Sequence, residues 1–267
     1  MKIFQGFLDL FKNRAIIGRM AYKEVTDHYA GSALGLVWAI LQPLFLIALY
    51  TFIFTFVFKV RITTTDSPFR YAFYAMAGLI PWISMSASLS KSVLAISSKA
   101  SLVKQAIFPT ETLPVSAIVA NFTPLFVGLI IYLIMMLIWS PQQFSYWILL
   151  LPLVILIHFI FTLGVGYFLA IAGAYFRDLT EIVTLLLTVG MFVTPILYIE
   201  GMVPKPLVIL MNFNLLAHLI YMYRDILYFG QINHPWSFVI FSSFAIFIFI
   251  LGHYSFRKIK HYFANVL

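Results

Sequence analysis

Arg177 and Asp178 are the adjacent charges in this chain whose setting most suggests chemistry. They belong to the motif AYFRDL (174–179) and follow a stretch, from Thr112 to Phe176, without any Asp, Glu, Lys or Arg. A cation next to a carboxylate in apolar sequence is typical of a buried catalytic or ion-conducting site, or of a corner where a chain leaves a membrane and returns. A second such pair, Arg224 and Asp225, occurs further along. The predicted elements around these charges distinguish between the two interpretations.

Other residue patterns that carry chemistry are missing from the sequence. There is no cysteine, which excludes thiolate nucleophiles and cysteine-ligated zinc. The phosphate loop GxxxxGK[ST] and the zinc motif HExxH do not occur. The six histidines show no pair at ligand spacing: they are His28, His158, His218, His234, His253 and His261. The sequence therefore predicts no catalytic, metal or cofactor site on this chain.

Composition indicates a protein that lies in a membrane. The chain has 267 residues, of which 63% are hydrophobic and 10% are charged, whereas soluble domains carry roughly 25% charged residues. A net charge of +8 comes from few residues and shows no basic groove of the kind that binds nucleic acid. We therefore expect membrane lipids as partners, basic residues that anchor the chain at the membrane surface, and no nucleic acid.

The apolar intervals are long enough for six membrane-spanning helices. A helix needs about 20 apolar residues to cross the hydrocarbon core. The predicted fold is all-α, with spans at residues 34–58, 71–91, 114–138, 147–173, 182–199 and 236–256. Residues 206–228 contain too many polar interruptions for a crossing, and we predict a re-entrant pair of helices there on the outer side. Arg177 and Asp178 then lie in the short turn between the fourth and fifth spans, which makes a catalytic pair improbable.

The distribution of basic residues predicts the orientation. With the N-terminus inside, the predicted inner segments hold twelve of the 17 Lys and Arg residues and the outer segments hold five. Positive residues accumulate on the cytoplasmic side of membrane proteins. Both termini are therefore expected in the cytoplasm.

Two segments outside the spans have helical periodicity. Residues 2–24 place Phe4, Phe7, Leu8 and Phe11 on one face, which is typical of an amphipathic helix at a membrane surface. Residues 92–107, between the second and third spans, alternate apolar residues with basic or hydroxyl residues. This second segment either presents a face to a cytoplasmic partner or anchors at the interface, and its pattern alone fits both.

In and beside the spans, small and aromatic residues suggest packing contacts and a substrate surface. Gly31 and Gly35 have GxxxG spacing, and Gly166 opens a ladder of small residues, so both sets permit close helix contact. Tyr50, Phe54 and Phe58 share one helix face. That face either packs against lipid and protein or forms a wall on which sugar rings stack.

Six stretches in order along the chain resemble one known family. They are HYAGSALGLVWAILQPLFLIALYTFIFTFVF (28–58), AGLIPW (77–82), LVKQAIFPTETLPVS (102–116), AYFRDL (174–179), TPILY (194–198) and NLLAHLIYMYRDILYFG (214–230). Together they resemble the transmembrane permease of ABC-2 type polysaccharide exporters, over essentially the whole chain. The chain departs from the family pattern at His28 and Ala30, where basic residues are common, and at Leu215, where proline is usual.

The resemblance implies a permease that moves lipid-linked O-antigen, capsular polysaccharide or teichoic acid across the bacterial cytoplasmic membrane, with O-antigen favoured. It implies a homodimer with a channel on the dimer axis, paired with two copies of a separate ATP-binding subunit. ATP and Mg are expected on that subunit, and no cofactor is expected on this chain. The alternatives are a small-molecule or drug ABC-2 exporter, a channel without ATP coupling, and a membrane glycosyl- or acyltransferase, for which no constellation of acids and histidines exists.

The resemblance also implies roles for particular residues. Residues 2–24 match the interface helix and 92–107 the coupling helix, with an ATPase-coupling surface formed by Phe4, Phe11, Arg14, Ser98, Lys99, Lys104 and Phe108. The residues expected along the substrate channel are Trp38, Tyr50, Phe54, Phe58, Trp82, Thr194 and Tyr198. The residues expected to have structural roles in the motifs are Arg177, Asp178, Pro195, Arg224 and Asp225.

Overall fold

The computed structural model describes residues 10–57, 69–104, 108–139, 145–176, 178–198, 211 and 213–263. Within these residues every regular element is a helix. The α-helices are α2 (Arg14–His28), α3 (Trp38–Phe52), α4 (Phe69–Leu94), α5 (Ala100–Val103), α6 (Thr112–Asn121), α7 (Thr123–Trp139), α8 (Leu151–Tyr175), α9 (Leu179–Val193), α11 (Leu215–Arg224) and α12 (Pro235–Ile259). Short 3-10 or π turns are η1 (Gly35–Val37), η2 (Ile53–Val57), η3 (Ser97–Lys99), η5 (Tyr146–Leu150), η7 (Asp225–Phe229) and η8 (Lys260–Tyr262).

Among the residues that the structure describes, five helical segments are long and apolar enough to cross a membrane. They are Gly35–Phe52, Arg70–Leu94, Thr112–Trp139, Tyr146–Tyr175 and Pro235–Tyr262. The chain is therefore a multi-pass membrane protein, and the prediction of an all-α fold is confirmed. The sixth predicted span falls on α9, which is apolar but has 15 residues, so a crossing at 182–199 stays a prediction.

The end of α9 has a local cause in the sequence. Thr194 adopts an extended backbone conformation with φ −86° and ψ 140°. The next residue is Pro195, and a residue that precedes proline is pushed out of the helical region by the proline ring. The chain turns here, and Thr194, Pro195 and Ile196 are buried.

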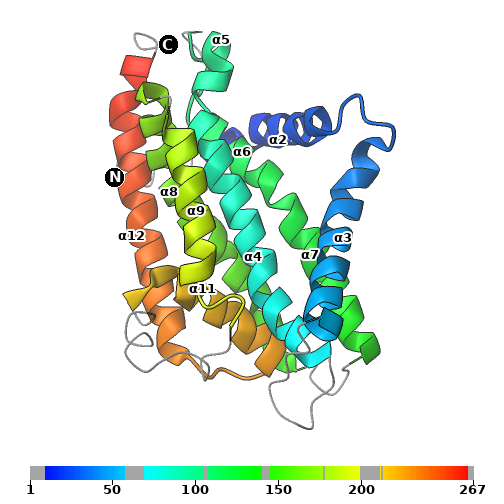
Figure 1. Cartoon of the computed structure of the whole chain (residues 1–267). Coiled ribbons are helices and arrows are strands. Elements are labelled where there is room, and N and C mark those ends of the chain that lie inside the picture. The colour runs from blue at the N-terminus through cyan, green and yellow to red at the C-terminus, as the bar shows by residue number, and fades with distance from the viewer. Residues whose placement is uncertain are drawn as a thin grey trace.

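Helix α4 is the centre of the bundle. It contacts α3, α6, α7, α8, α9 and α11, and Figure 1 shows it running through the middle of the molecule. Ser84, Ser88 and Ser92 recur every fourth residue on one buried face, which is the spacing of a helical stripe. Ser84 donates a hydrogen bond to the carbonyl oxygen of Asn121 at 3.0 Å. Small hydroxyl side chains thus let α4 approach its neighbours closely.

Helices α8 and α12 cross with their backbones in close contact. A Cβ atom added to Gly252 would lie 2.3 Å from the carbonyl oxygen of Gly164, and one added to Gly164 would lie 2.6 Å from the backbone nitrogen of Phe249. Only glycine permits such contact between two backbones. The predicted small-residue ladder in this span includes Gly166, which packs against Ile118 of α6 and Ser92 of α4.

The other glycine pair has a different role from the one its spacing suggested. Gly31 and Gly35 lie between α2 and α3, with φ +80° and +52° and no atom within 4 Å of an added Cβ. They provide left-handed backbone conformations where the chain turns from α2 towards α3. Their spacing, which permits close contact when both glycines lie on one helix, here falls in a turn.

Two short helices mark opposite ends of the bundle. Figure 1 shows α2 lying across one end of the long helices and α11 at the other end. We refer to these as the α2 end and the α11 end. α11 is buried from Ala217 to Arg224, and it packs on α4 and α12. The predicted re-entrant region 206–228 includes α11; its residues 206–210 and 212 lie outside the described residues.

Candidate functional site

A large cavity opens between α2, α3, α4 and the α6–α7 pair. Its volume is about 920 Å³, which is large enough for a drug-sized ligand. Along α4 it extends from Met76 to Lys91, a rise of roughly 22 Å at 1.5 Å per residue. The cavity is therefore long as well as wide, and it follows the direction of the membrane-spanning helices.

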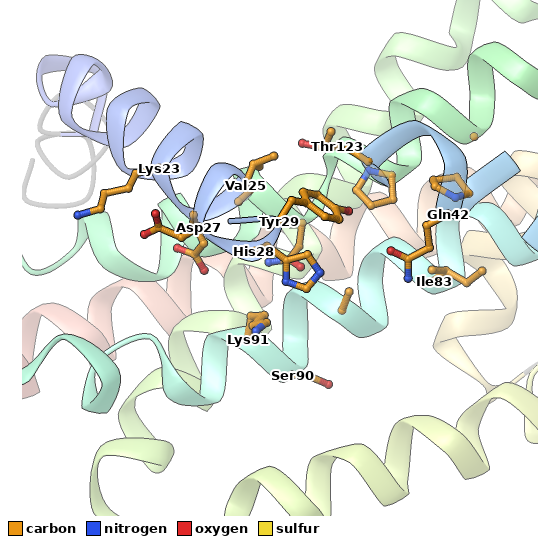
Figure 2. A pocket seen from close by; sticks show the side chains of 18 of the residues that line it. Lys23, Val25, Asp27, His28, Tyr29, Gln42, Ile83, Ser90, Lys91 and Thr123 are labelled. Carbon is orange, nitrogen blue, oxygen red and sulfur yellow. The ribbon is translucent and has the colours of Figure 1, made fainter. Parts of the chain in front are cut away.

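The part of the cavity beside α2 is charged. Its lining includes the cationic side chains of Arg19, Lys23, Lys91 and Lys99 and the carboxylates of Glu24 and Asp27. Figure 2 shows Asp27 and His28 at the end of α2 above Lys91 and Ser90 of α4. Four cations against two carboxylates give this mouth a net positive charge. An anionic group is the ligand that such a surface attracts.

The rest of the cavity is mainly apolar. Leu46 and Ile47 of α3 face Leu79, Ile80 and Ile83 of α4 along it. Some polar groups remain, since Gln42, Tyr50, Asn121 and Thr123 also line the cavity. The charged mouth and apolar depth together match an amphipathic ligand with an anionic head, because each part is solvated by surroundings of its own kind.

An ion pair crosses the mouth of this cavity. The Nζ atom of Lys99 lies 2.8 Å from Oε2 of Glu24, and the two side chains are 26% and 24% exposed. Glu24 belongs to α2, and Lys99 ends the short turn η3 that follows α4. The pair therefore ties α2 to the connection between α4 and α5 while remaining accessible to solvent.

A second ion pair holds the start of α6. Nζ of Lys260 in η8 lies 2.5 Å from Oε1 of Glu111. Burial alone raises the pKa of Glu111, but the hydrogen bond from Lys260, a backbone hydrogen bond and the charges of Lys260 and Arg257 outweigh it, so the pKa of Glu111 lies below its ordinary value. Glu111 is therefore ionised at neutral pH, and this pair lies outside the cavity lining.

The residues expected to form the ATPase-coupling surface lie in several places near the α2 end. Arg14 places its guanidinium 4.8 Å from the ring centre of Phe11, and Phe11 is exposed. Ser98 donates a hydrogen bond to the carbonyl oxygen of Leu94 at 2.6 Å. Lys104 is exposed directly after α5, and Phe108 is half-buried in the cavity lining. Phe4 lies outside the described residues, and so do residues 2–9 of the predicted interface helix 2–24. The coupling role of all these residues stays a prediction.

The aromatic residues expected along a channel are dispersed. Tyr50 lines the cavity, and Trp38 is exposed at the start of α3. Trp82 is buried, and a Cβ on Gly190 of α9 would lie 3.1 Å from its ring. Phe54 lies in η2 with a side chain that is not described, and Phe58 lies outside the described residues.

Two further channel candidates lie where α9 ends. Thr194 is buried and its Oγ1 accepts a hydrogen bond from Nδ2 of Asn214 at 3.2 Å. Tyr198 donates a hydrogen bond to the carbonyl oxygen of Val193 at 3.1 Å. Both residues thus hold the turn after α9, and their part in a channel stays a prediction.

Arg224 is the centre of a buried contact network at the α11 end. Its guanidinium carbon lies 3.7 Å from the ring centre of Tyr74. Its Nη2 donates to the carbonyl oxygen of Ile196 at 2.7 Å and its Nε to that of Tyr74 at 3.3 Å. The side chain therefore joins α11, α4 and the turn after α9.

Asp225, the neighbour of Arg224, fastens the start of α12. Its Oδ2 accepts hydrogen bonds from the backbone nitrogens of Asn233 and His234 at 3.0 and 2.8 Å, and its Oδ1 lies 2.9 Å from Nδ1 of His234. The ring of His234 stacks on Tyr221 with centres 4.5 Å apart. This adjacent pair of charges thus makes separate contacts that fix three helices.

Arg177 and Asp178, the adjacent charges in the motif AYFRDL, are described only in part. Asp178 is exposed and immediately precedes α9 without a side-chain capping bond, whereas Arg177 lies outside the described residues. Within the described residues no group of three or more His, Cys, Asp or Glu is arranged to hold a metal ion.

Sequence reasoning missed the cavity and both ion pairs. Glu24 and Lys99 are separated by 75 positions, and Glu111 and Lys260 by 149. No periodicity within one element links such residues. The one available signal was the unusual presence of carboxylates, Glu24 and Asp27, in a mostly basic segment next to the first apolar interval.

Apolar membrane-crossing helices and a cavity with a charged mouth define a multi-pass membrane protein suited to an amphipathic substrate. The family model described as ABC-2 type transporter matches residues 17–228. This chain belongs to the ABC-2 type transporter family, and the predicted family membership is confirmed.

Three relatives show which branch of the family is similar. The O-antigen export system permease protein RfbA of Klebsiella pneumoniae is 26% identical over 92% of this chain and 92% of its own length. The protein of the same name from Myxococcus xanthus is 34% identical over 71% of this chain and 70% of its own. The polysialic acid transport protein KpsM of Escherichia coli is 23% identical over 86% and 88%.

Proposed function

We propose that this chain is the permease subunit of an ATP-driven exporter of a lipid-linked polysaccharide, with O-antigen as the favoured cargo. The observation that carries this proposal is the cavity, whose basic mouth and apolar depth suit a lipid with an anionic phosphate head. The similarity to O-antigen and polysialic acid transport proteins supports a polysaccharide as the attached group.

Different residues of the cavity bind the two parts of the lipid. Lys91 and Lys99, with Arg19 and Lys23 of α2, attract the phosphate groups, because ammonium and guanidinium groups form charge-assisted hydrogen bonds with them. Leu79, Ile80 and their neighbours on α3 receive the first part of the hydrocarbon chain. In this scheme the α2 end faces the cytoplasm and α2 lies at the membrane surface.

The export step itself relies on partners. A homodimer with six spans per subunit, a channel on the dimer axis and two separate ATP-binding subunits completes the proposal. ATP and Mg would bind to those subunits, whose movements would reach this chain through α2 and the α5 region. The polymer would then pass outward, lipid end first, along aromatic residues that stack on sugar rings without selecting one sequence.

The test is reconstitution of the permease with its ATP-binding subunits in lipid vesicles. Lipid-linked polysaccharide is expected to stimulate ATP hydrolysis and to become protected from an external glycosidase. Lys91→Glu is expected to raise the substrate concentration for half-maximal stimulation at least tenfold, because it replaces attraction by repulsion at the cavity mouth. Equal stimulation by small amphiphiles that carry neither a glycan nor a diphosphate would instead favour a small-molecule exporter. Glycan movement without the ATP-binding subunits would favour a channel.

A further inference from the structure

We propose that the ion pair between Glu24 and Lys99 senses whether the cavity is occupied and passes this information to the α5 region. The inference rests on the proposed function, since it assumes that an anionic lipid head enters the cavity mouth. Lys99 is then a positioning residue that exchanges its partner, from the carboxylate of Glu24 to the phosphate of the lipid.

The position of the pair links two places that a transporter has to coordinate. Both residues line the cavity mouth. The same contact, 2.8 Å long, fastens α2 to η3, and η3 leads directly into α5 and the exposed Lys104. A change in this one contact therefore acts on the cavity wall and on the region expected to meet the ATP-binding subunit.

The chemistry of the Glu24–Lys99 pair allows Lys99 to exchange the carboxylate for another anionic partner. An ammonium group is a point charge with three donors on a flexible stem, so it can turn to a new acceptor. Both side chains are about a quarter exposed, and such pairs contribute little to stability. A diphosphate carries more negative charge than a carboxylate, and Lys91 and Arg19 also line the mouth to share it.

The exchange of partners by Lys99 also pushes α2 and η3 apart. A phosphate group bound to Lys99 lies beside the carboxylate of Glu24, and like charges at this distance repel. The tie between α2 and η3 is then broken. A ligand shifts a conformational equilibrium only when it interacts differently with the two states, and the loss of this contact supplies that difference.

The chain contains a matched pair that lacks the link to the cavity. Glu111 and Lys260 form an ion pair of the same kind, 2.5 Å long, between the start of α6 and η8. Neither residue lines the cavity. Breaking this second pair is expected to loosen the fold locally without changing the response to a ligand in the cavity.

The experiment measures ATP hydrolysis per assembled complex in vesicles that contain the permease and its ATP-binding subunits. Geranylgeranyl diphosphate serves as the anionic lipid probe, geranylgeraniol as the uncharged lipid and inorganic diphosphate as the free anion. The wild-type complex is expected to hydrolyse ATP faster in the presence of geranylgeranyl diphosphate, and not in the presence of the other two compounds. A response to inorganic diphosphate alone would assign the site to a free anion and overturn the lipid part of the proposal.

Three variants separate sensing from simple stabilisation. Glu24→Gln is expected to raise basal hydrolysis about threefold and to reduce the stimulation factor by the same ratio, because the tie is already broken. Lys99→Gln is expected to do the same and also to raise the probe concentration for half-maximal response, since it removes a cation. Glu111→Gln, the matched control, is expected to keep the wild-type stimulation factor.

A charge exchange keeps the inference testable if a single variant assembles poorly. The double variant Glu24→Lys with Lys99→Glu restores an ion pair across the same gap, and it is expected to lower basal hydrolysis below that of either single variant. Wild-type stimulation factors in Glu24→Gln and Lys99→Gln would overturn the sensing role while leaving the proposed function intact. A wild-type complex that ignores the lipid diphosphate would overturn the proposed use of the cavity itself.

Discussion

Charged residues at the α11 end are buried, whereas those at the α2 end remain accessible. Arg224 and Asp225 are 1% and 0% exposed, and each makes several short contacts with main-chain groups. Glu24 and Lys99 are each about a quarter exposed and hold one another by a single contact. A buried charge held by hydrogen bonds is costly to disturb, while a partly exposed pair exchanges partners at little cost. The charges at the α11 end thus stabilise the fold, whereas the ion pair at the α2 end can exchange partners when a ligand binds.

Replacing Arg224 by Leu is expected to have the largest effect. The change removes the hydrogen bonds to the carbonyl oxygens of Tyr74 and Ile196 and leaves both buried, at a cost of about 3 kcal/mol. Thermal unfolding of the purified permease in detergent measures the loss. Arg224→Lys, which keeps a cation, should lose less; equal losses would show that a positive charge alone does not stabilise this site.

Asp225→Ala is expected to rank second. It leaves the backbone nitrogens of Asn233 and His234 without their acceptor, which costs about 2 kcal/mol. The same unfolding measurement applies, with hydrogen exchange at the start of α12 as a local reading. Unchanged exchange at these two amides would contradict the fastening role of Asp225.

Glu24→Gln is expected to change stability by less than about 1 kcal/mol, because the pair is partly exposed. Its effect on the substrate response of ATP hydrolysis should nevertheless exceed that of Asp225→Ala, normalised to assembled complex. A loss of stability as large as that of Arg224→Leu would remove the contrast between the two ends.

The pH dependence of the Glu111–Lys260 pair gives the smallest expected effect. The pKa of Glu111 is lowered in the folded protein, so its contribution is fully present above the ordinary pKa of 4.5 and is lost as the pH falls through the lowered value. Unfolding temperatures between pH 7 and pH 3 should show this loss, worth up to about 1 kcal/mol. In Glu111→Gln that component should be missing; a rise in stability on acidification would contradict the sign.

Much of the architecture follows from local sequence. Charge-free apolar intervals predicted the helices that are long enough to cross a membrane, because only helical backbone satisfies its own hydrogen bonds in lipid. Six short motifs in order predicted the ABC-2 family. The proline at position 195 similarly explains where α9 ends. These features depend on neighbours within one element, and a single sequence contains that information.

The spacing of Gly31 and Gly35 shows the limit of local reasoning. Four residues apart, they matched a helix contact motif, yet their positive φ angles place them in a turn. The close crossing of α8 and α12 instead uses Gly164 and Gly252, which no motif connects. Spacing within one segment cannot show which distant segment lies opposite.

The sequence by itself determined that this protein lies in a membrane, that it is helical and that it belongs to its family. Composition and periodicity show this because they act within short stretches of chain. Tertiary structure alone decided which charges meet. Lys99 finds Glu24 across 75 positions and Arg224 reaches Tyr74 across 150. The cavity with its basic mouth likewise exists only because α2, α3 and α4 are brought together. Contacts between distant segments depend on how whole helices pack, and packing is settled by the entire fold at once.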